Sequence, residues 1–167
     1  MPAIVVLSAD STVTAPIVAA LRGQDHDVRA VAVHALPPVP LLRGEATHPA
    51  VAAVVDAVTT ADAVVLTTPV RKSSCSGLLK SLLDLLPQPA LLGKPVLAVA
   101  TGQVAAHAAV LDHALSPPLA RLGAHPLPRV FIPDREAGSP DLAAVVGALR
   151  AALVPAAIPG PRSRVRA

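Results

Sequence analysis

Apolar runs alternate with amphipathic segments along most of the chain. Five runs have the character of strands: 3–7, 27–33, 62–67, 95–100 and 128–132. The first, third and fourth are almost uninterrupted, which is typical of parallel strands covered on both faces. Helical spacing of apolar positions follows in five segments, at about 15–23, 48–60, 76–86, 104–121 and 141–154. Strand and helix therefore alternate throughout.

One connection breaks this alternation. Residues 34–47 read HALPPVPLLRGEAT, with three prolines and a glycine between the second strand and the next helix. Proline cannot donate a backbone hydrogen bond, and it disrupts the interior of a helix or a central strand. We therefore expect a loop without regular structure here.

Alternating strands and helices predict an α/β fold. Right-handed crossovers would build a three-layer sandwich around a five-stranded parallel sheet, within one domain over residues 1–154. In the doubly wound order 2-1-3-4-5, the first, third and fourth strands are neighbours. Loops rich in Ser, Thr and Gly follow these three strands, at 8–14, 68–76 and 101–104. Because ligands bind beyond the carboxyl ends of such strands, we expect the three loops to form one site.

Composition and charge narrow the function classes. The 167 residues are 53% hydrophobic and 15% charged, which suits a globular domain. The net charge of +3 comes from Arg162, Arg164 and Arg166 in a basic tail, 155–167, that we expect to be flexible. The remaining chain is neutral and has no basic stripe with interleaved aromatic residues, so we expect no nucleic-acid partner.

The sequence also argues against membranes, disulfides and metals. No apolar run approaches the roughly 18 residues of a membrane span, and the N-terminal stretch lacks the positive region of a signal peptide. Cys75 is the single cysteine, so no intrachain disulfide can form. The six histidines are scattered, which is unlike a metal site. We expect a cytoplasmic protein.

The stretch TTPVRKSSCSGLLKSLLDLLP, residues 67–87, carries the strongest chemical signal. A buried strand opens onto two cations, Arg71 and Lys72, and then onto four small polar residues before an amphipathic helix. Such a loop suits an anion or the polar edge of a cofactor. One of its serines is also expected to cap the helix.

That stretch and the following LLGKPVLAVATGQVAAHAAVLDHALSPPLARLGA together resemble a known family. From about residue 61 to 124 the chain is similar to the NAD(P)H-dependent FMN reductases, above all to the reductase components of two-component alkanesulfonate monooxygenases. The resemblance implies a flavodoxin-like fold, the cofactors FMN and NAD(P)H, and a homodimer or homotetramer. It also implies a partner monooxygenase that receives the reduced FMN.

The family assigns a role to each loop. The first would hold the FMN phosphate, the second would flank the isoalloxazine and ribityl groups, and the third would approach the pyrimidine edge. The cofactor-binding residues implied are Ser8, Ser11, Thr12 and Thr14 in the first loop, Pro69, Val70, Arg71, Lys72 and Ser73 in the second, and Thr101, Gly102 and Gln103 in the third. No catalytic side chain is expected, because the cofactor carries the chemistry of hydride transfer.

The first loop departs from the family pattern. The glycine and arginine of that pattern are absent, and Asp10 brings a negative charge beside the expected phosphate. We therefore expect FMN to bind in the micromolar range or more weakly, with riboflavin within about tenfold of it.

The roles of two histidines, and the surface of one predicted helix, allow more than one interpretation. His107 and His113 match positions at which relatives contact substrate or an interface, but either could be an ordinary helix histidine. The segment 104–121 is apolar around most of its circumference, which predicts an oligomer built on it and on 76–86.

Two other functions remain open. One is a degenerate flavodoxin-like subunit that has lost flavin binding and acts as a structural or regulatory partner. The altered first loop and the single aromatic residue, Phe131, favour it. The other is a quinone or azo reductase.

Overall fold

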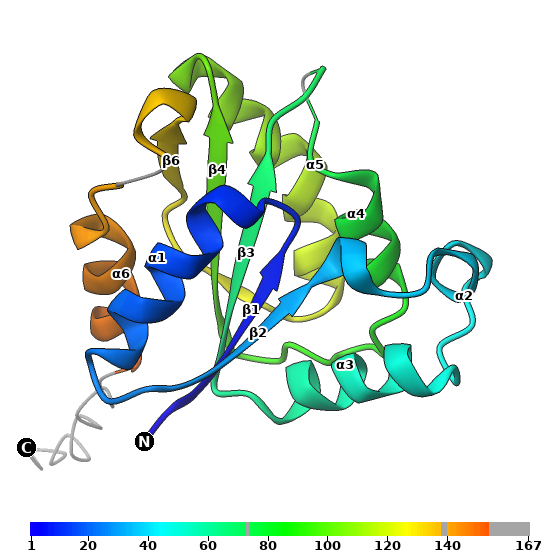
Figure 1. The fold of residues 1–167 in the computed structure, drawn as a ribbon. Helices are drawn as coiled ribbons and strands as arrows, with labels where there is room; N and C mark the ends of the chain where they lie inside the picture. Colours follow the sequence, from blue (N-terminus) through cyan, green and yellow to red (C-terminus); the bar gives the residue numbers. More distant parts are fainter. Residues whose placement is uncertain (73, 138–139, 154–167) are drawn as a thin grey trace, which may run out of the picture.

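The computed structural model describes residues 1–72, 74–137 and 140–153. A parallel sheet lies at its centre (Figure 1). Its strands are β1 Ala3–Ser8, β2 Asp27–Ala32, β3 Ala63–Pro69, β4 Pro95–Gly102, β5 His125–Pro126 and β6 Val130–Pro133. The basic tail expected at 155–167 lies outside the described residues.

The strand order is β2-β1-β3-β4-β5, which confirms the predicted topology. The fifth position is divided between two short strands, because β6 also pairs with β4. β5 pairs with the start of β4, from Pro95, and β6 pairs with its end, from Val99. Residues 127–129, between the two short strands, belong to neither of them.

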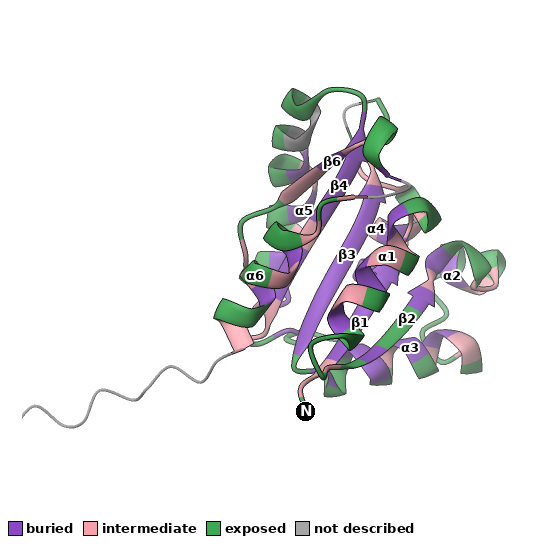
Figure 2. Ribbon diagram, turned by 60° about the vertical axis from the view of Figure 1, so that its left-hand side comes forward, coloured by how far each residue is buried: buried purple, intermediate pink, exposed green. Residues whose placement is uncertain are grey.

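Helices cover both faces of the sheet, as Figure 1 shows. The helices are α1 Ser11–Arg22, α2 Pro38–Arg43, α3 Pro49–Thr60, α4 Gly77–Asp84, α5 Ala108–Arg121 and α6 Ala143–Leu153. Short 3-10 turns are η1 Val33–Ala35, η2 Ala105–His107 and η3 Asp134–Glu136. The side chains of α1 and α6 form one core cluster with the sheet, and those of α3, α4 and α5 form the other. The inner strands are buried while the outer helix surfaces are exposed (Figure 2).

The loop expected at 34–47 is the clearest error of the sequence analysis, because α2 forms within it. Pro38 and Pro40 lie in the first turn of α2, where backbone N–H groups have no partner within the helix in any case. Leu41 anchors the helix in the core, and Gly44 ends it in a left-handed conformation with φ 76°. Clustered prolines at a helix start are therefore compatible with a short helix.

Helix α1 begins about four residues earlier than predicted. Asp10 is its N-cap, and the carboxylate accepts the backbone N–H of Thr12 at 3.0 Å. Pro16 lies inside the helix, where its missing N–H would have bonded the carbonyl of Thr12. The cap places the start of α1 directly at the end of β1.

Among its described side chains, helix α5 buries a stripe formed by Leu111, Leu115 and Leu119. Its exposed described positions include Asp112 and His113 as well as small residues. The predicted oligomer contact through α5 and α4 therefore remains a prediction. Within the described ranges, none of the helices combines the length and the apolar character that crossing a lipid bilayer requires.

Candidate functional site

The loops after β1, β3 and β4 meet in a pocket of about 800 Å³ at the carboxyl edge of the sheet. This edge is at the top of the molecule in Figure 1. The lining residues are Ala9, Asp10, Ser11, Thr12, His34, Pro69, Val70, Arg71, Lys72, Thr101, Gly102, Gln103, Asp134 and Ala137. The convergence of the three loops is thus present in the structure.

Nine of the twelve residues assigned to the site line this pocket: Ser11, Thr12, Pro69, Val70, Arg71, Lys72, Thr101, Gly102 and Gln103. Ser8 and Thr14 do not line it. Ser73 lies outside the described residues.

Ser8 and Thr14 are turned toward the protein. Their hydroxyl oxygens lie 2.5 Å apart, and both hydroxyls reach the backbone carbonyl of Asp10, at 3.1 Å and 2.6 Å. Ser8 is almost completely buried, with 2% of its surface exposed. Both hydroxyls therefore stabilise the turn between β1 and α1. The serine and threonine content of the loop could not show whether these hydroxyls bind a ligand or stabilise the turn.

Asp10 joins the loops after β1 and β4. One carboxylate oxygen accepts the N–H and the hydroxyl of Thr12, at 3.0 Å and 2.5 Å, and the other accepts the hydroxyl of Thr101. Thr101 is 1% exposed, so this contact lies against the core. The carboxylate thus fixes the start of α1 against the end of β4.

Asp10 is ionised at neutral pH. Its partial burial raises the pKa of the carboxyl group, but hydrogen bonds from Thr101 and Thr12 and the positive charge of Arg71 lower it further, so the pKa is below its usual value. A full negative charge therefore lies in the wall of the pocket.

The loop after β3 forms a small hairpin above the sheet edge. Arg71 and Ser74 exchange backbone hydrogen bonds of 3.1 Å and 3.0 Å, with Lys72 at a positive φ of 47°. At its base, the hydroxyl of Thr68 accepts the backbone N–H of Ser76 at 2.9 Å. Ser76 precedes α4 but its side chain makes no capping bond, and because Ser73 lies outside the described residues, the cap expected from one of the loop serines stays a prediction. The hairpin directs Arg71 and Lys72 to the pocket.

Two charged or titratable residues of the pocket were missed. His34 belongs to η1 after β2, and Asp134 to η3 after β6. Both directly follow strands that end at the same edge, which is the signal that could have identified them. With Arg71, Lys72 and Asp10, they give the pocket a mixed charge.

Gly102 lies between the pocket and the ring of Phe131. A Cβ atom at Gly102 would lie 3.5 Å from that ring and 3.8 Å from the side chain of Val70, which are ordinary contact distances. The lone aromatic residue therefore packs behind the pocket wall.

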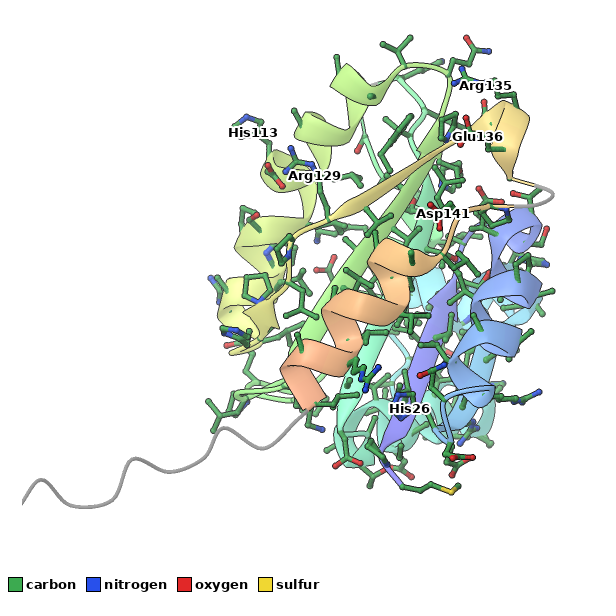
Figure 3. The ribbon with its side chains drawn as sticks, turned by 90° about the vertical axis from the view of Figure 1, so that its left-hand side faces the viewer. His26, His113, Arg129, Arg135, Glu136 and Asp141 are labelled. Carbon is green, nitrogen blue, oxygen red and sulfur yellow. The ribbon has the colours of Figure 1, made fainter. Side chains whose placement is uncertain are left out.

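The two candidate histidines have different positions. His113 is exposed on α5 and does not line the pocket. Figure 3 shows it on the outer side of α5 near Arg129, apart from Glu136 at the end of η3. His107 ends η2, and its side chain lies outside the described part. Among the described residues, no three His, Cys, Asp or Glu side chains gather closely enough to hold a metal ion.

Comparisons with known proteins agree on one family. Residues 8–137 match the family model described as NADPH-dependent FMN reductase. The chain is 40% identical over 117 residues to the FMN reductase (NADPH) of Escherichia coli K12, across 70% of this chain and 61% of that enzyme. It is 50% identical over 68 residues to the NADH-dependent FMN reductase SfnE of Pseudomonas putida, across 41% of this chain and 37% of that protein.

A solved structure extends the similarity. The apo form of an NADH:FMN oxidoreductase (EMOB) superposes with a TM-score of 0.78 at 32% identity, covering 91% of this chain and 87% of that one. The matches to the curated relatives span about three fifths of their length or less.

Proposed function

Because this chain belongs to the NADPH-dependent FMN reductase family, we propose that it is an NAD(P)H-dependent FMN reductase. It is an oxidoreductase that uses FMN and NADH or NADPH. The observation that carries this proposal is the single pocket in which the loops after β1, β3 and β4 meet. A volume of about 800 Å³ is in the range of cofactor sites.

The residues of the pocket fit most of an FMN molecule. Val70 and Gly102 offer apolar and backbone surface for a flat ring, and Arg71 and Lys72 offer positive charge. When bound, FMN supplies a two-electron acceptor for a hydride from the nicotinamide. The part of the pocket beside Asp10 fits a phosphate poorly, because an ionised carboxylate already occupies the start of α1.

The chain contributes position and electrostatics. Arg71 and Lys72 favour negative charge in the pocket, which accumulates when electrons enter a flavin. The hairpin that carries them is fixed by the bond between Thr68 and Ser76. No side chain is required as a general acid or base for hydride transfer, so the lack of a catalytic assignment is consistent with the reaction.

Partners and assembly belong to the same proposal. The similarity of residues 61–124 to the reductase components of alkanesulfonate monooxygenases supports delivery of reduced FMN to a monooxygenase in the cytoplasm. We also propose a homodimer or homotetramer built on α4 and α5. Analytical ultracentrifugation at micromolar concentration tests the assembly, and a monomer there would exclude it.

A flavin titration with a matched pair of arginine variants tests the site. Arg71→Ala should weaken FMN binding by about tenfold, because it removes one of the two cations on the hairpin. Arg150→Ala removes an exposed cation from α6, outside the pocket, and should leave binding unchanged. Equal titrations for both variants and the parent would show that FMN binds elsewhere.

One observation favours a second candidate function. Three of the four first-loop hydroxyls expected to bind phosphate are bonded to Asp10 instead, which is consistent with a subunit that has lost its flavin. This degenerate subunit would bind neither FMN nor riboflavin and would not oxidise NADH or NADPH.

A further inference from the structure

Most of the side-chain hydroxyls at the place where β1 meets α1 are bonded to one residue, Asp10. Five hydroxyl groups and one backbone N–H group are directed at Asp10. The hydroxyls belong to Ser8, Thr12, Thr14, Thr67 and Thr101, and the N–H group belongs to Thr12. Of the hydroxyls predicted to hold a phosphate, only that of Ser11 makes no such bond among the described contacts. Ser8, Thr14 and Thr67 bond the backbone carbonyl of Asp10, and Thr12 and Thr101 bond its carboxylate. Asp10 therefore takes most of the side-chain donors that an anionic ligand could use here.

The carboxylate itself has one acceptor position left. An ionised carboxylate has about four lone-pair sites, and three donors from Thr12 and Thr101 already use three of them. Asp10 lines the pocket and is partly exposed to it. The remaining site can accept a hydrogen bond from a ligand hydroxyl, but it offers nothing to a ligand that carries only acceptors.

From this arrangement we infer that Asp10 makes the pocket select a flavin whose ribityl chain ends in a neutral hydroxyl, as in riboflavin, over one whose chain ends in a phosphate. The inference rests on the proposed reductase function and names the substrate class of the same site. A terminal hydroxyl donates to Asp10, whereas a phosphate dianion has no proton to donate and is repelled by the carboxylate. Repulsion between such charges at the wall of a pocket reduces affinity by about tenfold.

The nearby cations do not cancel this effect. Arg71 is close enough to Asp10 for its positive charge to lower the pKa of the carboxyl group. The negative charge of Asp10 therefore offsets part of the attraction between Arg71 and a phosphate. Lys72 lies at the tip of the hairpin, on the β3 side of the pocket. Among the described contacts, neither cation makes a side-chain hydrogen bond to the first loop, which was expected to hold the phosphate.

Titrations of the full chain with riboflavin and with FMN test the inference directly. Riboflavin should bind at least as tightly as FMN. Asp10→Asn removes the charge and keeps a residue that caps helices well, so α1 should remain folded. This variant should raise the affinity for FMN relative to riboflavin by about tenfold.

Two further variants make the comparison specific. Asp10→Ser also removes the charge and caps well, and it replaces Asp10→Asn if that variant fails to fold. Asp62→Asn is the control, because its carboxylate accepts the backbone N–H of Ala3 at 2.7 Å before β3, at the opposite edge of the sheet. It should leave the ratio of the two affinities unchanged.

The outcomes separate this inference from the function on which it rests. Preference of the parent for FMN over riboflavin would overturn the inference and leave the reductase proposal standing. An affinity ratio that Asp10→Asn and Asp10→Ser leave unchanged would overturn it as well. Binding of neither flavin would overturn both.

Discussion

The contact between Thr101 and Asp10 gives the sharpest prediction about stability. Thr101→Val keeps the shape of a buried side chain but removes the hydroxyl that donates to the carboxylate. Hydrogen bonds to charged groups contribute about 1.5–3 kcal/mol, and water can partly replace this one because Asp10 is half-exposed. We expect the variant to lose about 1–2 kcal/mol of unfolding free energy. For a chain of this size, that loss corresponds to a decrease in Tm of about 2–8 °C.

The pH dependence of this loss follows from the pKa of Asp10. Burial raises it, but the bonds from Thr101 and Thr12 outweigh burial, so the folded pKa is below the unfolded value of about 3.9. Such a group stabilises the protein above its unfolded pKa, and the contribution disappears as the pH falls through the folded pKa. The difference between parent and Thr101→Val should therefore be complete near neutral pH and shrink as the pH falls below about 4.

Urea denaturation at several pH values measures both effects. Thr59→Val is the control, because the exposed hydroxyl of Thr59 bonds only a carbonyl of its own helix. It should change the unfolding free energy by less than about 0.5 kcal/mol. A Thr101→Val protein as stable as its parent, or a loss that is the same at every pH, would refute the assignment of Asp10 as an ionised acceptor.

Three other positions give smaller tests. Lys94→Met should lower the free energy of unfolding by about 1–2 kcal/mol, because the ammonium group bonds two carbonyls at the end of α3. The control is Lys80→Met, which removes only an exposed ion pair with Asp84. It should lower the free energy of unfolding by less than about 0.5 kcal/mol in the same denaturation experiment. Burial raises the pKa of the Cys75 thiol, so at neutral pH it should react with an alkylating reagent more slowly than a free thiol and accelerate as the pH rises; an equal rate would contradict this. Gly147→Ala should raise Tm, because the glycine lies within α6 and an added Cβ would have open space.

The sequence predicted the sheet well because burial leaves a direct signal. Strands such as β1 and β3 are covered on both faces and appear as continuous apolar runs. Their order follows from the connections and from the family resemblance. Helix α2 was missed because its prolines lie in the first turn, where the usual argument against proline does not apply. Composition alone does not show where a helix starts.

The site was predicted in outline but not in detail. Its loops were placed correctly because the carboxyl ends of neighbouring parallel strands lie at one edge. The direction in which a short side chain points cannot be predicted from the strand order. Ser8 and Thr14 look like ligand donors in the sequence, but they bond the carbonyl of Asp10. The charge of Asp10 was noticed, whereas its role as a cap and acceptor required the geometry of α1 and β4.

The central claim is that the pocket at the carboxyl edge binds a flavin that accepts hydride from NADH or NADPH. Anaerobic mixing of the purified chain with FMN and each nucleotide tests it most directly, with flavin and nicotinamide absorbance followed together. FMN should be reduced mole for mole as nucleotide is oxidised, and Arg71→Ala should need more FMN for half of the maximal rate than Arg150→Ala does. If neither nucleotide is oxidised in an FMN-dependent reaction, the pocket does not have this function.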